Sequence, residues 1–156
     1  MPPDYRTANL VVKTGDDGRV FWGGIGRRSL ELAAEDYLWT DIFGRRIFYS
    51  LDTFFQANLS ILPTLIQKIK ELAQIDTGTL FLDLYAGVGL FGLCFADTAA
   101  QIAFIEDTPA SVKLLHHNLK YHQIQNAEVY QWRVEEHLSP LLEKTKGMKR
   151  VAIVDP

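Results

Sequence analysis

Short apolar runs and longer amphipathic segments alternate after residue 50, and this alternation constrains the fold more than any other feature. The apolar runs are predicted strands at residues 79–84, 101–105, 127–132 and 150–154. Predicted helices, with apolar residues at helical spacing, lie at residues 58–74, 90–96, 108–122 and 134–144. Strands that are apolar throughout are typical of parallel sheets with helices on both faces. We therefore expect an α/β fold of the Rossmann-like, doubly wound type.

The first 50 residues have a different pattern, in which short apolar runs are separated by turn residues. Two β-hairpins are predicted, over residues 9–22 and 37–49, with turns at residues 15–18 and 43–44. Residues 29–36 are expected to form a short helical turn. The sequence thus predicts a β-hairpin-rich segment at residues 1–50, followed by a Rossmann-like domain at residues 51–156.

The last predicted strand, Val151-Ala152-Ile153-Val154, is followed only by Asp155-Pro156. As the final strand it would form an open edge with apolar side chains on both faces, which natural sheets avoid. We therefore expect that the sequence is the N-terminal part of a larger domain and that its parallel sheet is incomplete.

A glycine-rich loop follows the first predicted strand of this domain and opens the next helix. Gly87 would permit a tight turn, and Gly89 would let a ligand approach the backbone in front of a helix N-terminus. Gly92 completes a Gly-x-Gly-x-x-Gly spacing, which taken alone is a weak sign of a dinucleotide site. For Gly92 we favour close packing of the helix on the sheet over contact with a ligand.

Acidic residues end three of the predicted strands, at Asp83, Glu106 and Asp155. Glu106 lies about 20 residues after the loop, where a carboxylate commonly accepts hydrogen bonds from ribose hydroxyls. Carboxylates at this edge would repel a pyrophosphate but attract the ammonium and sulfonium groups of S-adenosylmethionine. This favours S-adenosylmethionine over a nicotinamide or flavin cofactor. The alternatives are a helix cap for Asp83 and a solvated strand end for Glu106.

These residues, together with Phe54-Phe55-Gln56-Ala57-Asn58, give the sequence a resemblance to the RNA uracil-C5 methyltransferases, which are class I enzymes. The resemblance covers residues 37–156, from the second predicted hairpin to the terminal Asp155-Pro156. It implies an incomplete class I methyltransferase fold, S-adenosylmethionine as cofactor, and methyl transfer to carbon 5 of uridine in tRNA or rRNA.

The resemblance also implies roles for individual residues. Gln56 would bind the methionine moiety of the cofactor, and Glu106 would hold the ribose. Asp155 would lie near the cofactor amine and the reacting base. Tyr85 and the loop glycines Gly87 and Gly89 would line the cofactor through backbone groups. Without the resemblance, Gln56 has an alternative role as a cap at the helix entry.

Methylation of carbon 5 requires a nucleophile, because this carbon is unreactive in uracil. In the family a cysteine thiolate adds to carbon 6 and a carboxylate later removes the carbon-5 proton, and both lie after the Asp-Pro motif. Cys94, the single cysteine, lies among Phe91, Leu93 and Phe95 and is expected to be a small buried hydrophobe. We therefore expect no catalytic residue in this sequence, and at most cofactor binding.

Charge and composition limit the remaining possibilities. The net charge is −3 and no basic segment stands out, so the sequence does not predict an RNA-binding surface by charge alone. One cysteine, no signal-peptide pattern and no run of membrane-spanning length predict a cytoplasmic protein without membrane or metal partners. RNA is expected as the partner of the full-length parent.

Three other functions stay open on the sequence alone. They are another class I methyltransferase, a nicotinamide-dependent oxidoreductase supported only by the three glycines, and a non-enzymatic binding module.

Overall fold

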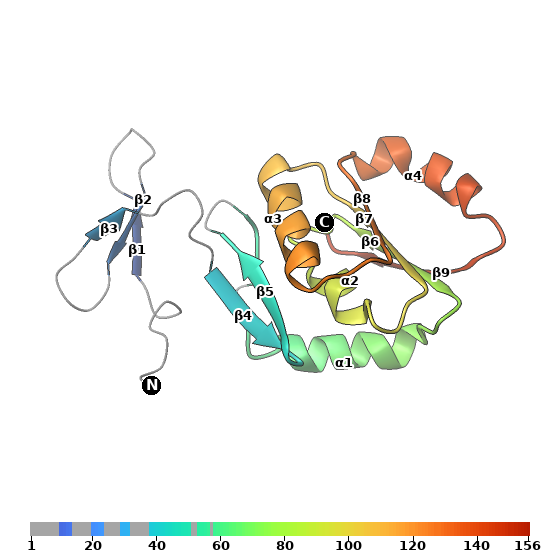
Figure 1. The fold of residues 1–156 in the computed structure, drawn as a ribbon, viewed down its shortest axis with the longest axis horizontal. Coiled ribbons are helices and arrows are strands. Elements are labelled where there is room, and N and C mark those ends of the chain that lie inside the picture. The colour runs from blue at the N-terminus through green and yellow to red at the C-terminus, as the bar shows by residue number, and fades with distance from the viewer. Residues whose placement is uncertain (1–9, 14–19, 24–28, 32–37, 51–52, 57) are drawn as a thin grey trace. The chain divides into compact units, whose positions relative to one another are not determined.

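The computed structural model describes residues 10–13, 20–23, 29–31, 38–50, 53–56 and 58–156 (Figure 1). The chain divides into two compact units, Met1–Trp39 and Thr40–Pro156. This division falls near the start of the second predicted hairpin and not at residue 50. The reason is that strand β5 (Arg45–Tyr49) packs against helix α3 (Pro109–Tyr121), which joins the hairpin to the larger unit.

The first unit contains an antiparallel sheet in the order β1 (Leu10–Lys13), β2 (Val20–Gly23) and β3 (Ser29–Glu31). The strands of the first predicted hairpin are confirmed, and their turn lies outside the described residues. The expected helical turn is wrong for Ser29–Glu31, because this segment pairs with β2 from Ser29 opposite Gly23 to Glu31 opposite Phe21. The rest of that expected turn lies outside the described residues.

The second predicted hairpin is confirmed by the pairing of β4 (Leu38–Ile42) with β5. Its turn residues Phe43 and Gly44 have φ angles of 51° and 75°. Positive φ at both central residues is the requirement of a type I′ turn, the type that matches the twist of paired strands. Ile42 and Ile47 are buried, so one face of this hairpin belongs to the core.

The larger unit is built on a four-stranded sheet in the order β8-β7-β6-β9, in which all neighbouring strands are parallel. The strands are β6 (Thr79–Leu84), β7 (Gln101–Ile105), β8 (Ala127–Tyr130) and β9 (Lys149–Val154). The helices are α1 (Leu62–Ala73), α2 (Leu90–Phe95), α3 and α4 (Val134–Lys144). The predicted Rossmann-like fold is confirmed. Helix α1 begins later than predicted, because Pro63 fits only its first turn.

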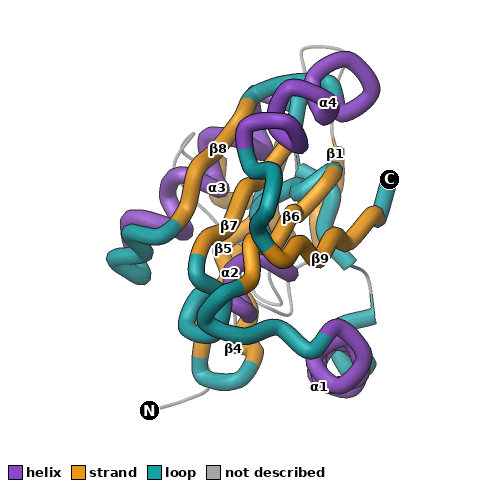
Figure 2. The backbone as a smooth tube through the Cα atoms, turned by 90° about the vertical axis from the view of Figure 1, so that its right-hand side faces the viewer, coloured by secondary structure: helices purple, strands orange, loops and turns teal. Residues whose placement is uncertain are grey.

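Side chains that alternate along β6 bind helices to both faces of this sheet. Leu80, Leu82 and Leu84 form one cluster with Val134 and Leu141 of α4. Phe81 points to the opposite face, where its ring centroid lies 5.1 Å from that of Phe95 in α2. Figures 1 and 2 show α4 and α2 on opposite sides of the strands. The carboxyl ends of β6, β7 and β9 therefore meet at one edge, between two helical layers.

Candidate functional site

The glycine-rich loop, residues 85–89, leaves the carboxyl end of β6 in an unusual backbone conformation. Tyr85, Gly87 and Gly89 have φ angles of 60°, 54° and 90°. The Gly89 N–H donates to the carbonyl of Ala86 over 2.8 Å, and the Ala86 N–H donates to the carbonyl of Ile105 over 3.0 Å. The loop is thus a tight turn that is fixed to the end of β7.

The two loop glycines have different surroundings. The position that a Cβ would take on Gly87 has no atom within 4 Å, which leaves an open space beside the backbone. On Gly89 the same position lies 2.4 Å from Cδ1 of Leu115 in α3. Packing and positive φ therefore require glycine at position 89, a cause that the sequence did not reveal. The approach of a ligand to this residue stays a prediction.

Gly92 is confirmed as a packing residue. A Cβ on Gly92 would lie 2.2 Å from Cε1 of Phe104, whose ring is fully buried. Helix α2 can therefore lie against β7 only because this side chain is absent.

We predict that Gly92→Ala lowers the free energy of unfolding by about 2 kcal/mol, because an added methyl group in a packed core forces its neighbours to shift. Urea unfolding at neutral pH measures the change. Gly78→Ala is the matched control, since its Cβ would make an ordinary contact of 3.4 Å with Asp76 Oδ1. Equal stability of the two variants would contradict the packing role of Gly92.

Glu106 directly follows β7 and connects the loop with α3. Its Oε2 accepts the N–H of Gly87 and its Oε1 accepts the N–H of Thr108, each over 2.8 Å. The side chain is buried, so the alternative of a solvated strand end is wrong. Each carboxylate oxygen keeps a second lone pair, with which it could accept a hydroxyl group beside the open side of Gly87.

Asp83 lies behind the loop and is 1% exposed. Its Oδ2 accepts the N–H of Gly92 over 2.7 Å, which confirms the alternative role as a cap on the first turn of α2. Burial, together with the smaller effects of the negative charges of Asp155 and Glu106, raises the pKa of Asp83 to about 7, although the hydrogen bond from Gly92 acts in the opposite direction. The carboxyl groups of Asp155 and Glu106 are therefore close enough to Asp83 to affect its pKa.

Gln56 reaches the same edge from a distant part of the chain. Its Nε2 donates to Oδ2 of Asp155, just after β9, over 2.9 Å. The preceding Phe55 stacks on Tyr49 of β5, with ring centroids 4.3 Å apart and planes 6° from parallel. Helix α1 begins at Leu62 with Ile61 as N-cap, so the helix-cap alternative for Gln56 is wrong.

Tyr85 connects the loop to the helix on the other face of the sheet. Its hydroxyl donates to Oε1 of Glu135, in the first turn of α4, over 2.8 Å. Sequence reasoning did not single out Glu135, because the contact depends on how α4 packs on the sheet. The backbone of Tyr85 nevertheless lies in the loop as predicted.

Cys94 lies in α2 and is partly buried. Burial raises the pKa of its thiol to about 12, although the Arg45 guanidinium acts in the opposite direction. The expected character of a small buried hydrophobe is consistent with this position, and the thiolate that a nucleophile needs is scarce at neutral pH.

The site as a whole suits a positively charged ligand with hydroxyl groups. It combines an open glycine loop with the carboxyl groups of Asp83, Glu106 and Asp155 at one sheet edge. In the described part of the chain, His, Cys, Asp and Glu do not gather in threes that could hold a metal ion. None of the described helices combines the length and apolar character needed to cross a membrane.

Comparisons with known proteins give consistent results. A family model described as tRNA (Uracil-5-)-methyltransferase matches residues 28–155. The tRNA (uracil-5-)-methyltransferase homolog B of Mus musculus is 32% identical over 126 residues, which are 80% of this chain and 26% of that protein. An uncharacterized RNA methyltransferase of Lactobacillus johnsonii is 30% identical over 132 residues, which are 84% of this chain and 28% of that protein. The chain thus spans little more than a quarter of these relatives.

Solved structures confirm the fold. Trm5b from Pyrococcus abyssi superposes with a TM-score of 0.57 and 18% identity, over 82% of this chain and 36% of that one. The tRNA (uracil-54, C5)-methyltransferase of the same organism, in complex with S-adenosyl-L-homocysteine, gives a TM-score of 0.52 and 21% identity, over 60% of this chain and 23% of that one. At these identities the likeness concerns the fold alone.

Proposed function

The chain belongs to the tRNA (uracil-5-)-methyltransferase family, and we propose that it forms the cofactor-binding part of an enzyme that methylates carbon 5 of uridine in RNA. S-adenosylmethionine is the cofactor, which removes the nicotinamide alternative. The observation that carries the proposal is the bridge from Glu106 to Gly87 and Thr108, with the carboxyl groups of Asp83 and Asp155 at the same edge.

We propose that each side chain of the site contacts a different part of the cofactor. Glu106 accepts the ribose hydroxyls beside Gly87, where the open space beside the backbone leaves room for the sugar. Gln56 and Asp155, already joined to each other, bind the methionine end. Asp83 acts from behind the loop, where its ionised form, which predominates above about pH 7, would stabilise the positive charge of the ligand. The bound cofactor supplies an electrophilic methyl group on its sulfonium.

The RNA substrate is proposed for the whole protein. A uridine inside a duplex cannot present carbon 5 to a buried methyl donor, so the base would be flipped out or single-stranded. The names of the matched relatives favour tRNA. Modification of rRNA and a cytoplasmic location stay predictions.

Nucleoside mass spectrometry of cellular RNA tests this function. Deletion of the gene that encodes the chain should lower 5-methyluridine in tRNA or rRNA, and the wild-type gene should restore it. A gene that carries Glu106→Ala should not restore the 5-methyluridine content. An unchanged 5-methyluridine content in both RNA classes would contradict the proposed reaction.

We also propose that these 156 residues do not catalyse methyl transfer by themselves. Cys94 is their single cysteine, and burial keeps its thiol in the neutral form. Incubation with S-adenosylmethionine and an RNA containing 5-fluorouridine should leave the intact mass of the chain unchanged. Alkylation of the denatured chain is the control, because it shows that the Cys94 thiol is chemically intact. A covalent RNA adduct mapped to Cys94 would contradict this prediction.

A further inference from the structure

Asn118, in the last turn of α3, is fully buried although it is polar. Its Oδ1 accepts the N–H of Phe48 over 2.8 Å, and its Nδ2 donates to the carbonyls of Phe48 and Val88, each over 3.0 Å. Phe48 belongs to β5 and Val88 lies between the two loop glycines. One amide group therefore joins a hairpin, a helix and the glycine loop.

We propose that Asn118 is a positioning residue that fixes the glycine loop and the Gln56 segment relative to each other. The proposal rests on the proposed function, because it concerns the two parts of the chain assigned to opposite ends of the cofactor. Asn118 itself is not placed in contact with the ligand.

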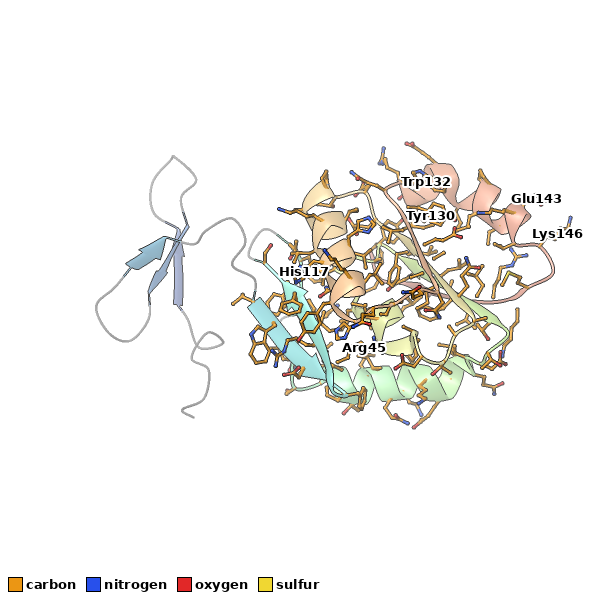
Figure 3. All side chains as sticks on the ribbon, in the orientation of Figure 1. Arg45, His117, Tyr130, Trp132, Glu143 and Lys146 are labelled. Atoms are coloured by element: carbon orange, nitrogen blue, oxygen red, sulfur yellow. The ribbon has the colours of Figure 1, made fainter. Side chains whose placement is uncertain are left out.

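The path from Asn118 to Gln56 runs through the hairpin. The Asn118 amide forms hydrogen bonds with both the N–H and the carbonyl of Phe48, as a neighbouring strand would. It thereby sets the position of β5 along α3. The Phe48 ring also packs edge-on against His117 and Tyr121 of the same helix, with centroids 4.8 and 4.9 Å apart. Figure 3 shows His117 where α3 faces the hairpin. The ring of the next residue, Tyr49, stacks on the ring of Phe55, and Gln56 is the residue after Phe55.

The path to the glycine loop is shorter. The Val88 carbonyl bonds Nδ2 of Asn118, and Leu115, almost one turn earlier in α3, fills the space beside Gly89. Helix α3 therefore holds the loop by one hydrogen bond and one packing contact. Without the amide, the Val88 carbonyl would be left buried without this donor, which favours movement of the loop.

The chemistry of the position calls for an amide. Asparagine offers two N–H donors and a carbonyl acceptor, and all of them are used here. Aspartate has the same shape but no donor when ionised, so it would face two carbonyl oxygens with a negative charge. Alanine removes every one of these bonds.

The test compares Asn118→Ala with Asn126→Ala by calorimetric titration with S-adenosylhomocysteine. Asn126 is a matched control, because its Nδ2 also donates to two backbone carbonyls, those of Ala96 and Ala99, each over 3.0 Å and away from the loop. Both variants should lose thermal stability. Only Asn118→Ala should bind the ligand more weakly, by about tenfold or more, the loss expected for one misplaced contact.

Amide hydrogen exchange of residues 85–89 in the ligand-free chain gives a second readout, at a temperature where circular dichroism shows both variants folded. Faster exchange of this loop in Asn118→Ala than in Asn126→Ala supports the proposal. Asn118→Ser, whose neutral hydroxyl keeps one hydrogen-bond donor, serves in the same comparison if the alanine variant does not fold. Unchanged loop exchange and affinity in the Asn118 variant, or equal losses in Asn126→Ala, would overturn it. Failure of the wild-type chain to bind the ligand would count against the proposed function, while the exchange result would still decide the role of Asn118.

Discussion

The Asp83→Asn variant is expected to be more stable than the wild type at pH 8, by as much as about 4 kcal/mol. The pKa of Asp83 is raised to about 7 by burial, from the ordinary value of about 4 in an unfolded chain. The folded protein therefore binds the carboxyl proton of Asp83 more tightly than the unfolded chain does. The resulting stabilisation is complete below about pH 4 and is lost as the pH rises through about 7. Asparagine is neutral at every pH and can still accept the Gly92 N–H.

Urea unfolding between pH 4.5 and 8.5 measures this difference, because other titrating groups cancel when the two proteins are subtracted. Asp76→Asn is a control for which the change in stability has the opposite sign, since this variant should be less stable than the wild type throughout this pH range. The hydrogen bonds from Lys149, Thr79 and Gly78 lower the pKa of Asp76 to about 2, so its stabilisation is present above about pH 4. Parallel pH curves for wild type and Asp83→Asn would contradict the buried acid described above.

The second large effect is expected for Glu106→Ala, which should weaken binding of S-adenosylhomocysteine by about 100-fold. The change removes the acceptor of the Gly87 and Thr108 N–H groups and the proposed partner of the ribose. Hydrogen bonds to a charged group contribute about 1.5–3 kcal/mol each, which corresponds to this loss. Isothermal titration calorimetry on the folded variant gives the affinity.

Glu143→Ala is the control for this measurement, because Glu143 is an exposed carboxylate of α4 whose partner is Lys146 (Figure 3). Its affinity should equal that of the wild type. A folded Glu106→Ala variant that binds as tightly as Glu143→Ala would exclude Glu106 from the binding site.

Local patterns in the sequence predicted the strands of the parallel sheet closely. Residues 79–84 and 101–105 are strands with the predicted bounds, because uninterrupted apolar runs flanked by glycine or polar residues have few other stable arrangements. The hairpin around Phe43-Gly44 was predictable for a similar reason, since its turn chemistry is local. The short β3 was missed, because three residues carry no pattern and the strand depends on its partner β2.

The grouping of the candidate site residues was predictable, but their contacts were not. Acidic residues at strand ends and the spacing of the glycines predicted a shared sheet edge, and the structure brings these residues together there. The capping role of Asp83, the packing role of Gly89 and the amide bonds of Asn118 all depend on partners many residues away. An asparagine between Leu115 and Leu119 on the buried face of a predicted helix was the available signal for the last of these.

Calorimetric titration of the wild-type chain with S-adenosylmethionine, and separately with NAD, measures which cofactor this site binds. The glycine loop and the nearby carboxyl groups at the carboxyl edge of this sheet should bind a positively charged adenosine derivative. We expect saturable binding of S-adenosylmethionine at a single site and no heat of binding with NAD. Binding of NAD in preference to S-adenosylmethionine, or of neither, would contradict this expectation.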